Sequence, residues 1–279
     1  MILIDGKKVA SDLKQQLKKQ LEPHIAAGKT CGLAVIIAGE DPASKVYVRN
    51  KINSCAEVGI KSFHYELPSD VSEKEITDII EELNANKDVY GILVQLPLPK
   101  GIDERKILSK IDPQKDEDGF SPFQMGKLVL GEKCFPSCTP GGVMELHKYY
   151  SISVAGKKAV VIGRSNTVGK PMALMLLKQN ATVTVCHSKT ENIGKIAAEA
   201  DILVVAIGKP HFVTADMVKD GAVVIDVGIN RVDGKLCGDV DYENVKDKCS
   251  YITPVPGGVG PMTVAMLMKN TVDAFLENV

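Results

Sequence analysis

The feature that most constrains the fold is an alternation of short apolar runs with longer helical patterns. Runs of aliphatic and β-branched residues are typical of strands covered on both faces, and amphipathic stretches between them are typical of the covering helices. This order predicts a parallel α/β architecture. In the first half, strands are expected at Leu33–Ala38, Lys61–Glu66 and Gly91–Gln95. Helices are expected around Val9–Leu21 and at Ala43–Val58 and Ser72–Leu83, the last opened by a capping box of Ser72 and Glu75.

A second alternating series follows a stretch rich in Pro, Gly and Asp. This stretch, residues 112–140, is interpreted as loops at a domain boundary. Strands are then expected at Ala159–Ile162, Thr182–Cys186, Ile202–Ala206 and Ala222–Val227. Helices are expected at Val168–Asn180, Ile193–Ala200, Ala215–Lys219 and, after the Pro/Gly-rich segment Pro254–Pro261, at Met262–Leu276. The 279 residues suit two domains of ordinary size.

Composition excludes several classes of protein. The chain is 44% hydrophobic with a net charge of −1, so neither disorder nor a nucleic-acid footprint is expected. The longest apolar runs fall far short of the roughly 20 residues that span a bilayer, and no secretory signal is visible. The seven cysteines include no CxxC pair, which favours reduced thiols in the cytoplasm and predicts no metal site.

A glycine-containing turn connects an expected strand to an expected helix. Gly163 and Gly169 bracket it, and backbone N–H groups at such a helix start can face a phosphate. The spacing is not GxGxxG, and a tight turn without a ligand is about equally compatible with it. The next strand ends without the acidic residue that holds an NAD ribose, and it offers Ser188 and Lys189 instead. Because Arg164, one of few arginines, lies inside the turn, NADP is predicted over NAD.

A second candidate site lies on the helix expected at Ala43–Val58. Ser44, Tyr47 and Lys51 share one face of it, where a partly desolvated lysine can act as an acid or base. On spacing alone, a solvated lysine remains the commoner interpretation. Gln95 ends an apolar strand, and polar residues at the carboxyl ends of parallel strands face the ligand crevice. Gln95 is therefore expected to bond Lys51 or a substrate, although it could also simply terminate the strand.

The acidic run Asp112–Phe120 does not fit a calcium loop. Counted from Asp112, the sixth position is Glu117 rather than glycine and the twelfth is Phe123 rather than glutamate. We expect an exposed turn in which one carboxylate, Asp118, faces the cleft, where it would suit an amino-heterocycle.

Seven segments together resemble the bifunctional methylenetetrahydrofolate dehydrogenase/cyclohydrolase family. They follow family order over nearly the whole chain, and the GILVQLPLP run and the last segment are the most specific. The segments are Tyr47-Val48-x-x-Lys51, Gly91–Pro99, Asp116-x-Asp118-Gly119, Cys138-Thr139-Pro140, Gly163-Arg164-Ser165-x-x-Val168-Gly169-x-Pro171, Cys186–Thr190 and Pro254–Thr263.

The resemblance implies hydride transfer from 5,10-methylenetetrahydrofolate to NADP, followed by hydrolysis of the methenyl product to 10-formyltetrahydrofolate. It implies that Lys51 is the central cyclohydrolase residue with Gln95 as its partner, that Tyr47 stacks on the aminobenzoyl group and that Asp118 binds the pterin. The substrate site would also include Pro256, Gly257 and Gly258. The cofactor residues implied are Thr139, Gly163, Arg164, Ser165, Val168, His187, Ser188, Ala206, Gly208 and Ile229.

The expected organisation follows from these motifs and the resemblance. Residues 1–138 and 262–279 would form an α/β substrate domain, residues 139–261 a Rossmann-like nucleotide domain, and the active-site cleft would lie between them. The resemblance further implies a cytoplasmic homodimer connected to purine biosynthesis. The chain departs from the family pattern at Asn53, Glu117 (where Val is usual), Ser137 and Gly141. Two alternatives remain, a dehydrogenase that has lost hydrolysis and a folate- or nucleotide-binding regulatory protein.

Overall fold

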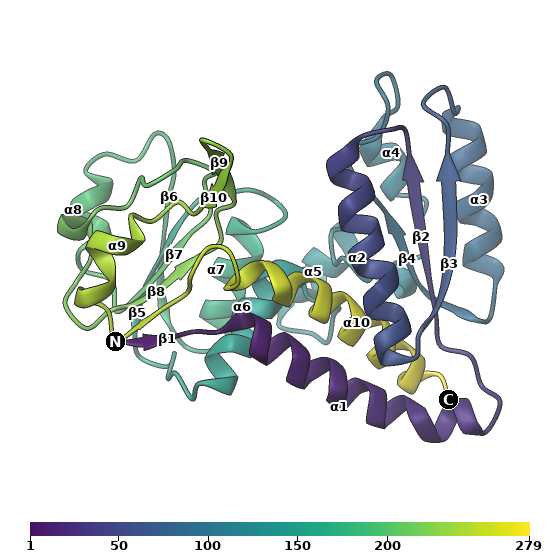
Figure 1. The fold of residues 1–279 in the computed structure, drawn as a ribbon, viewed down its shortest axis with the longest axis horizontal. Helices are drawn as coiled ribbons and strands as arrows, with labels where there is room; N and C mark the ends of the chain where they lie inside the picture. Colours follow the sequence, from purple (N-terminus) through teal and green to yellow (C-terminus); the bar gives the residue numbers. More distant parts are fainter. The chain divides into compact units, whose positions relative to one another are not determined.

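The chain divides into two compact units, each with its own parallel sheet (Figure 1). The computed structural model describes residues 1–279, apart from the side chain of Ala43. The six-stranded unit comprises Met1–Ala10, Leu128–Glu132 and Ser137–Thr263. The three-stranded unit comprises Ser11–Lys127, Lys133–Pro136 and Val264–Val279. The α/β class expected from the alternating pattern is confirmed.

The three-stranded sheet has the order β3-β2-β4 and is parallel throughout. Its strands are β2 (Gly32–Ala38), β3 (Lys61–Leu67) and β4 (Val89–Val94). Every residue of the central strand β2 is buried, which explains its uniformly apolar sequence. Ile76, Ile80 and Leu83 of α3 (Glu73–Ala85) and Ile107 of α4 (Glu104–Leu108) join the core cluster that contains Ile36.

Local signals define the helix ends in this unit. The helix α2 (Pro42–Val58) begins after Asp41, whose carboxylate accepts the Ser44 N–H, and it ends at Gly59 with φ +95°. Helix α2 packs against β2 and β3. The capping box predicted at Ser72 and Glu75 is confirmed, because both of its reciprocal bonds are present.

The six-stranded sheet has the order β1-β11-β8-β7-β5-β6, and all its pairs are parallel. The strands are β1 (Ile2–Leu3), β5 (Lys158–Ile162), β6 (Thr182–Cys186), β7 (Ile202–Val205), β8 (Val223–Asp226) and β11 (Tyr251–Ile252). The helices α7 (Gly169–Lys178) and α8 (Ile193–Ala197) connect three successive strands of the sheet, β5, β6 and β7. Strand β6, at one edge of the sheet, is partly exposed, and both residues of β1, at the other edge, are exposed.

Short elements complete this unit. They are η2 (Ala215–Met217), α9 (Tyr242–Val245), η3 (Lys246–Lys248) and the antiparallel pair β9 (Asn230–Val232) and β10 (Lys235–Cys237). The hairpin turn between β9 and β10 is Asp233-Gly234, and both residues have positive φ. An Asp-Gly pair of this conformation matches the twist of the flanking strands, which explains a hairpin that the apolar pattern did not predict.

The first ten residues lie in a different unit from the one that the sequence predicts. We placed them with the substrate domain, but β1 pairs with β11, with Ile2 opposite Tyr251 and Leu3 opposite Ile252. A strand of two exposed residues carries no periodic signal, so the sequence pattern could not reveal the pairing.

The stretch 112–140 is not made of loops alone. After η1 (Pro113–Lys115) it contains α5 (Pro122–Leu130) and the start of α6 (Cys138–Tyr149). Proline is favourable in the first turn of a helix, so Pro122 is compatible with the start of α5. In α6, a Cβ at Gly142 would lie 2.7 Å from the Cβ of Met262, so the glycine permits close packing. Packing thus favours a helix over the weak propensity of these residues.

Two long helices begin in one unit and end in the other. The helix α1 (Gly6–Ala26) buries Val9, Leu17 and Leu21, as its periodicity predicts. The helix α10 (Val259–Glu277) begins inside the Pro/Gly-rich segment, three residues earlier than expected. Among the described residues, no helix is both long and apolar enough to cross a bilayer.

Gly6 allows the first turn of α1 to touch the loop before α10. A Cβ at Gly6 would lie 1.7 Å from Gly258 O, and the Lys7 N–H donates to Gly257 O at 3.2 Å. We predict that Gly6→Ala lowers the free energy of unfolding by about 2 kcal/mol, because backbone has to move. Gly126→Ala, where nothing lies within 4 Å, is the matched control. Thermal unfolding followed by circular dichroism measures both, and equal melting temperatures for the two variants would contradict the prediction.

Candidate functional site

A lysine–glutamine pair joins α2 to the carboxyl end of β4. Lys51 Nζ donates to Gln95 Oε1 at 2.9 Å, and Gln95 Nε2 donates to Leu96 O at 2.7 Å. The Gln95 N–H donates to Ile36 O at 2.8 Å, which continues the ladder of the sheet by one residue. The side-chain amide is therefore oriented at both ends, and it holds a half-buried lysine at the edge of the sheet.

The other residues predicted around this pair have different environments. Ser44 is buried, whereas Tyr47, one turn before Lys51 on α2, is 49% exposed. An exposed ring beside a held lysine is available to stack on a flat ligand. Asp118 is half-buried on the turn that follows η1, and η1 packs against β4. All of these residues belong to the three-stranded unit.

In the six-stranded unit, the switch point of the sheet lies between β5 and β7. Strand β5 lies between β6 and β7 and comes before both along the chain. The connection from β5 leads to β6 on one side of it, and the connection from β6 leads to β7 on the other side. A Cβ at Gly163, which follows β5, would lie 2.3 Å from Ala206 O, which follows β7. A Cβ at Gly169 would lie 2.3 Å from Gly163 O. Both glycines of the turn are therefore required by close backbone approach.

A pocket of about 420 Å³ lies at this switch point. The ends of β5, β6 and β7 all contribute to it, which is where doubly wound sheets bind nucleotides. Its lining residues are Ile162, Gly163, Arg164, His187, Ser188, Ile193, Ala206, Ile207, Lys209 and Phe212. The side chains of Arg164 and Lys209 provide cations for phosphate groups, so the residues present fit a dinucleotide.

The glycine turn is held internally by Ser165. Its hydroxyl accepts the N–H groups of Val168 and Gly169 at 3.1 and 3.2 Å, which orders the start of α7. Ser137 donates to Thr167 O at 2.6 Å and so ties the start of α6 to the same turn. Ser137 is one of the positions where the chain departs from the family pattern, and here it has a clear structural role.

Two buried aspartates hold the carboxyl ends of β7 and β8. The Asp239 carboxylate accepts the N–H groups of Ile207, Gly208 and Lys209 at 2.7 to 3.0 Å. The Asp226 carboxylate accepts the N–H groups of Gly228, Asp239 and Val240 at 2.9 to 3.0 Å. Burial raises the pKa of Asp226 to about 6, although these N–H groups act in the opposite direction.

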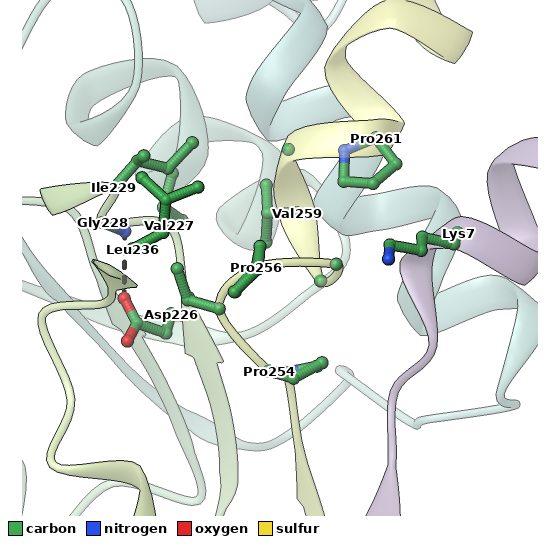
Figure 2. Close-up of a pocket in the computed structure, with 14 residues that line it drawn as sticks. Lys7, Asp226, Val227, Gly228, Ile229, Leu236, Pro254, Pro256, Val259 and Pro261 are labelled. Atoms are coloured by element: carbon green, nitrogen blue, oxygen red, sulfur yellow. Dashed lines mark hydrogen bonds between the residues drawn. The ribbon is translucent and has the colours of Figure 1, made fainter. Parts of the chain in front are cut away.

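A second pocket, of about 180 Å³, lies beside Asp226 (Figure 2). Its walls are mostly apolar and come from the end of β8, from Leu236 of β10 and from residues 254–261. Figure 2 shows Asp226 and Gly228 on one side and Lys7 on the other. The stem of Lys7 lies along Gly257, since a Cβ there would be 3.3 Å from Lys7 Cε, and the φ of +106° at Gly257 favours glycine.

The structure brings five of the ten expected cofactor residues together at one pocket. Gly163, Arg164, His187, Ser188 and Ala206 line the first pocket, and Ile229 lines the second with Pro256, Gly257 and Gly258. Thr139 lines neither and instead exchanges a 2.9 Å hydrogen bond with Thr263. Sequence reasoning missed Lys209, Phe212, Asp226 and Asp239. The one available signal was an apolar strand ending in aspartate at Val223–Asp226.

The amino-acid sequence matches one protein family over most of its length. Residues 4–118 match the family described as tetrahydrofolate dehydrogenase/cyclohydrolase, catalytic domain, and residues 137–279 match the NAD(P)-binding domain of the same family. The chain belongs to the tetrahydrofolate dehydrogenase/cyclohydrolase family. The resemblance stated from the motifs is thereby confirmed.

Individual members of this family are similar along their whole length. A protein of Campylobacter hominis named "Bifunctional protein FolD" is 58% identical over 98% of this chain and 96% of its own length. One of the same name from Lachnoclostridium phytofermentans is 57% identical over 97% of this chain and 96% of its own. The crystal structure of the bifunctional FolD of Campylobacter jejuni superposes with a TM-score of 0.98 at 49% identity, covering both chains completely.

A family member from Trypanosoma brucei has been solved with its NADP cofactor and an inhibitor. It superposes with a TM-score of 0.94 at 39% identity over 100% of this chain and 98% of its own. The NAD(P)-binding part of the family corresponds to the unit that carries the glycine turn and the first pocket.

We predict that Asp239→Ala weakens NADP binding about tenfold or more. The three N–H groups of residues 207–209 lose their acceptor, at about 1–3 kcal/mol for each donor left unsatisfied, so the wall of the first pocket is no longer held. Asp239→Asn keeps one acceptor oxygen and is expected to fall between wild type and Asp239→Ala. Fluorescence titration with NADPH measures the affinity, with Asp247→Ala, an exposed carboxylate of the same unit, as control. Unchanged affinity in Asp239→Ala would contradict the prediction.

Proposed function

We propose that this protein is a bifunctional one-carbon folate enzyme. It oxidises 5,10-methylenetetrahydrofolate to 5,10-methenyltetrahydrofolate with NADP and hydrolyses the product to 10-formyltetrahydrofolate. The observation that carries the proposal is the oriented Lys51–Gln95 pair, in a chain that is 58% identical to a protein named bifunctional FolD. A binding protein without catalysis would have no need of an oriented lysine.

Hydrolysis requires a group that moves a proton. Water adds to the methenyl carbon, a carbon–nitrogen bond of the ring breaks, and one proton is released overall. We assign that proton transfer to Lys51, whose Nζ is held by Gln95 Oε1 at 2.9 Å. Because the methenyl substrate is cationic, a lysine that shares or gives up its proton is easier to accommodate beside it than a fully protonated one.

Hydride transfer makes a different demand. The hydride leaves the methylene carbon with its electron pair, and NADP, when bound, accepts it. No acid or base has to act on that carbon, so the protein's task is to hold the two reactants in near-attack contact. We propose that Tyr47 stacks on the aminobenzoyl group, that Asp118 binds the pterin, and that Pro256, Gly257 and Gly258 complete the folate site.

The cofactor site follows from the first pocket. We propose that Gly163, Ser165 and Val168 hold the pyrophosphate, with Arg164, His187 and Ser188 near the 2′-phosphate. Strand β6 ends in Cys186-His187-Ser188, with no acidic residue to repel that phosphate. The proposed cofactor site also includes four further residues that the family resemblance implies, Thr139, Ala206, Gly208 and Ile229. The enzyme is also proposed to act as a cytoplasmic homodimer that supplies one-carbon units for purine biosynthesis.

We predict that the two activities respond differently to Lys51→Ala. Hydrolysis is expected to fall by about two to four orders of magnitude, because the proton-transferring group is lost. The dehydrogenase, which depends on positioning, is expected to fall less. Spectroscopic assays follow methenyl consumption without NADP and NADPH formation separately. The control is Lys45→Ala on the same helix, an exposed lysine paired with Glu40. Full hydrolysis by the Lys51 variant would refute the assignment.

We predict that Arg164→Ala reduces the preference for NADP over NAD. Losing one charge-assisted contact to the 2′-phosphate corresponds to about a tenfold rise in the KM for NADP. NAD has no 2′-phosphate, so its KM is expected to change little. Arg231→Ala is the control, since its guanidinium donates to Gly234 O in the β9–β10 hairpin. Steady-state kinetics with both cofactors measures the ratio. A wild type that prefers NAD, or equal changes for the two cofactors, would overturn this assignment.

A further inference from the structure

Glu117 is a fully buried carboxyl in the acidic turn, between Asp116 and Asp118. Its relative exposure is 0%, and its side chain fills the space above Gly91 of β4. A Cβ at Gly91 would lie 2.5 Å from Glu117 Cγ, 2.9 Å from Leu33 Cδ1 and 3.3 Å from Thr271 Oγ1. Glu117 is therefore enclosed by β2, β4 and α10, all within the three-stranded unit.

The backbone around Glu117 is fixed on both sides of Asp118. Asn270 Nδ2 donates to Glu117 O at 2.7 Å and to Pro136 O at 3.1 Å. After Asp118, the Ser121 N–H donates to the Asp116 carboxylate at 2.7 Å, and Gly119 takes a positive φ of +68°. Asp118 therefore lies in a stretch of backbone that is held on both sides, with Glu117 next to it.

The charges that face Glu117 are mostly negative. They come from its own turn, Asp116 and Asp118, and from α10, Asp273 and Glu277, while Cys31 lies at the start of β2. Burial raises the pKa of Glu117 well above its ordinary value, and the four carboxylates act in the same direction.

Three lysines on or next to the segments named above have partners of their own. Lys269 pairs with Asp273, and Lys133 pairs with Glu277. The ammonium group of Lys115 donates to the last carbonyls of α3, Leu83 O and Asn84 O, and to Asn86 O. Every effect that acts on Glu117 therefore raises its pKa.

We propose that Glu117 is a positioning residue for Asp118: its neutral carboxyl seats the turn between β4 and α10, and its ionisation at alkaline pH unseats the turn and weakens folate binding. The proposal rests on the proposed function, because it takes Asp118 as a pterin-binding carboxylate. It assigns Glu117 no contact with the substrate.

The direction of the effect follows from linkage. An acid whose pKa is raised in the folded state binds more protons there than in the unfolded state. Its contribution to stability is complete below the unfolded pKa and is lost as the pH rises through the folded value. An ionised Glu117 gains free energy by reaching water, and the movement that allows this carries the adjacent Asp118 with it.

The experiment compares wild type, Glu117→Gln and Glu117→Met from pH 7 to pH 9.5. In wild type, the KM for 5,10-methylenetetrahydrofolate is expected to rise about fivefold or more at the alkaline end. This rise is expected to exceed any change in the two neutral variants. The KM for NADP is expected to change little. Both variants are expected to stay within about twofold of wild type at pH 7, since they remain uncharged. Glu82→Gln, an exposed carboxylate of α3, is the control and is expected to keep the wild-type profile.

Urea unfolding across the same range provides a readout that does not depend on catalysis. Wild type is expected to lose stability relative to Glu117→Met as the pH rises. The proposal is overturned if either folded variant keeps the alkaline rise in KM, or if wild type and both variants stay equally flat. It is also overturned if only kcat changes. A wild type without either activity would contradict the proposed function, whereas an active wild type with unchanged profiles in the variants would contradict only the role of Glu117.

Discussion

The six-stranded unit depends on how backbone N–H groups are satisfied beyond the carboxyl ends of β7 and β8. A buried N–H without an acceptor costs about 1–3 kcal/mol. Six backbone N–H groups between residues 207 and 240, including that of Asp239, donate to the two buried carboxylates of Asp226 and Asp239. Because the Asp239 N–H donates to Asp226 while the Asp239 carboxylate accepts from residues 207–209, the two aspartates form one connected network. The two pockets described above both border that network.

In the three-stranded unit, a neutral glutamine rather than a carboxylate holds Lys51 in place. The amide oxygen of Gln95 accepts from Lys51, and its amide nitrogen donates to Leu96 O, which fixes the orientation of the amide. A carboxylate at this position would stabilise the protonated lysine through a charge pair. A glutamine orients the amine through a neutral oxygen instead, which suits the proton transfer proposed for hydrolysis.

Strong local patterns made much of the fold predictable. The uniformly apolar β2 and β5, the capping box at Ser72 and the periodic α1 each carry a local signal, and each appears within a few residues of its expected range. Elements that form through tertiary packing were missed. The pairing of β1 with β11 involves two residues, and α6 forms through packing at Gly142 despite its weak propensity.

The candidate site divides in the same way. The Lys51–Gln95 contact could be expected, because a helix face and a strand end each showed a polar residue where a ligand crevice belongs. Asp239 could not, because it lies in a loop beyond β10 and bonds to residues some thirty positions earlier. No spacing rule connects such residues. The structure alone shows why Gly163 and Gly169 must be glycines, because a Cβ at either would collide with neighbouring backbone.

Two buried carboxyls, Asp226 and Glu117, show which physical effects shift the pKa of a buried acid. Asp226 and Glu117 are both buried, and desolvation is the largest effect on the pKa of each. Asp226 receives three backbone N–H bonds, which favour the charged form and keep its pKa near 6, so it is mostly ionised at neutral pH. Carboxylates act on the side chain of Glu117 instead, and they raise its pKa further above the ordinary value. Burial alone therefore does not set the pKa of an acid inside this protein, since the neighbouring dipoles and charges also contribute.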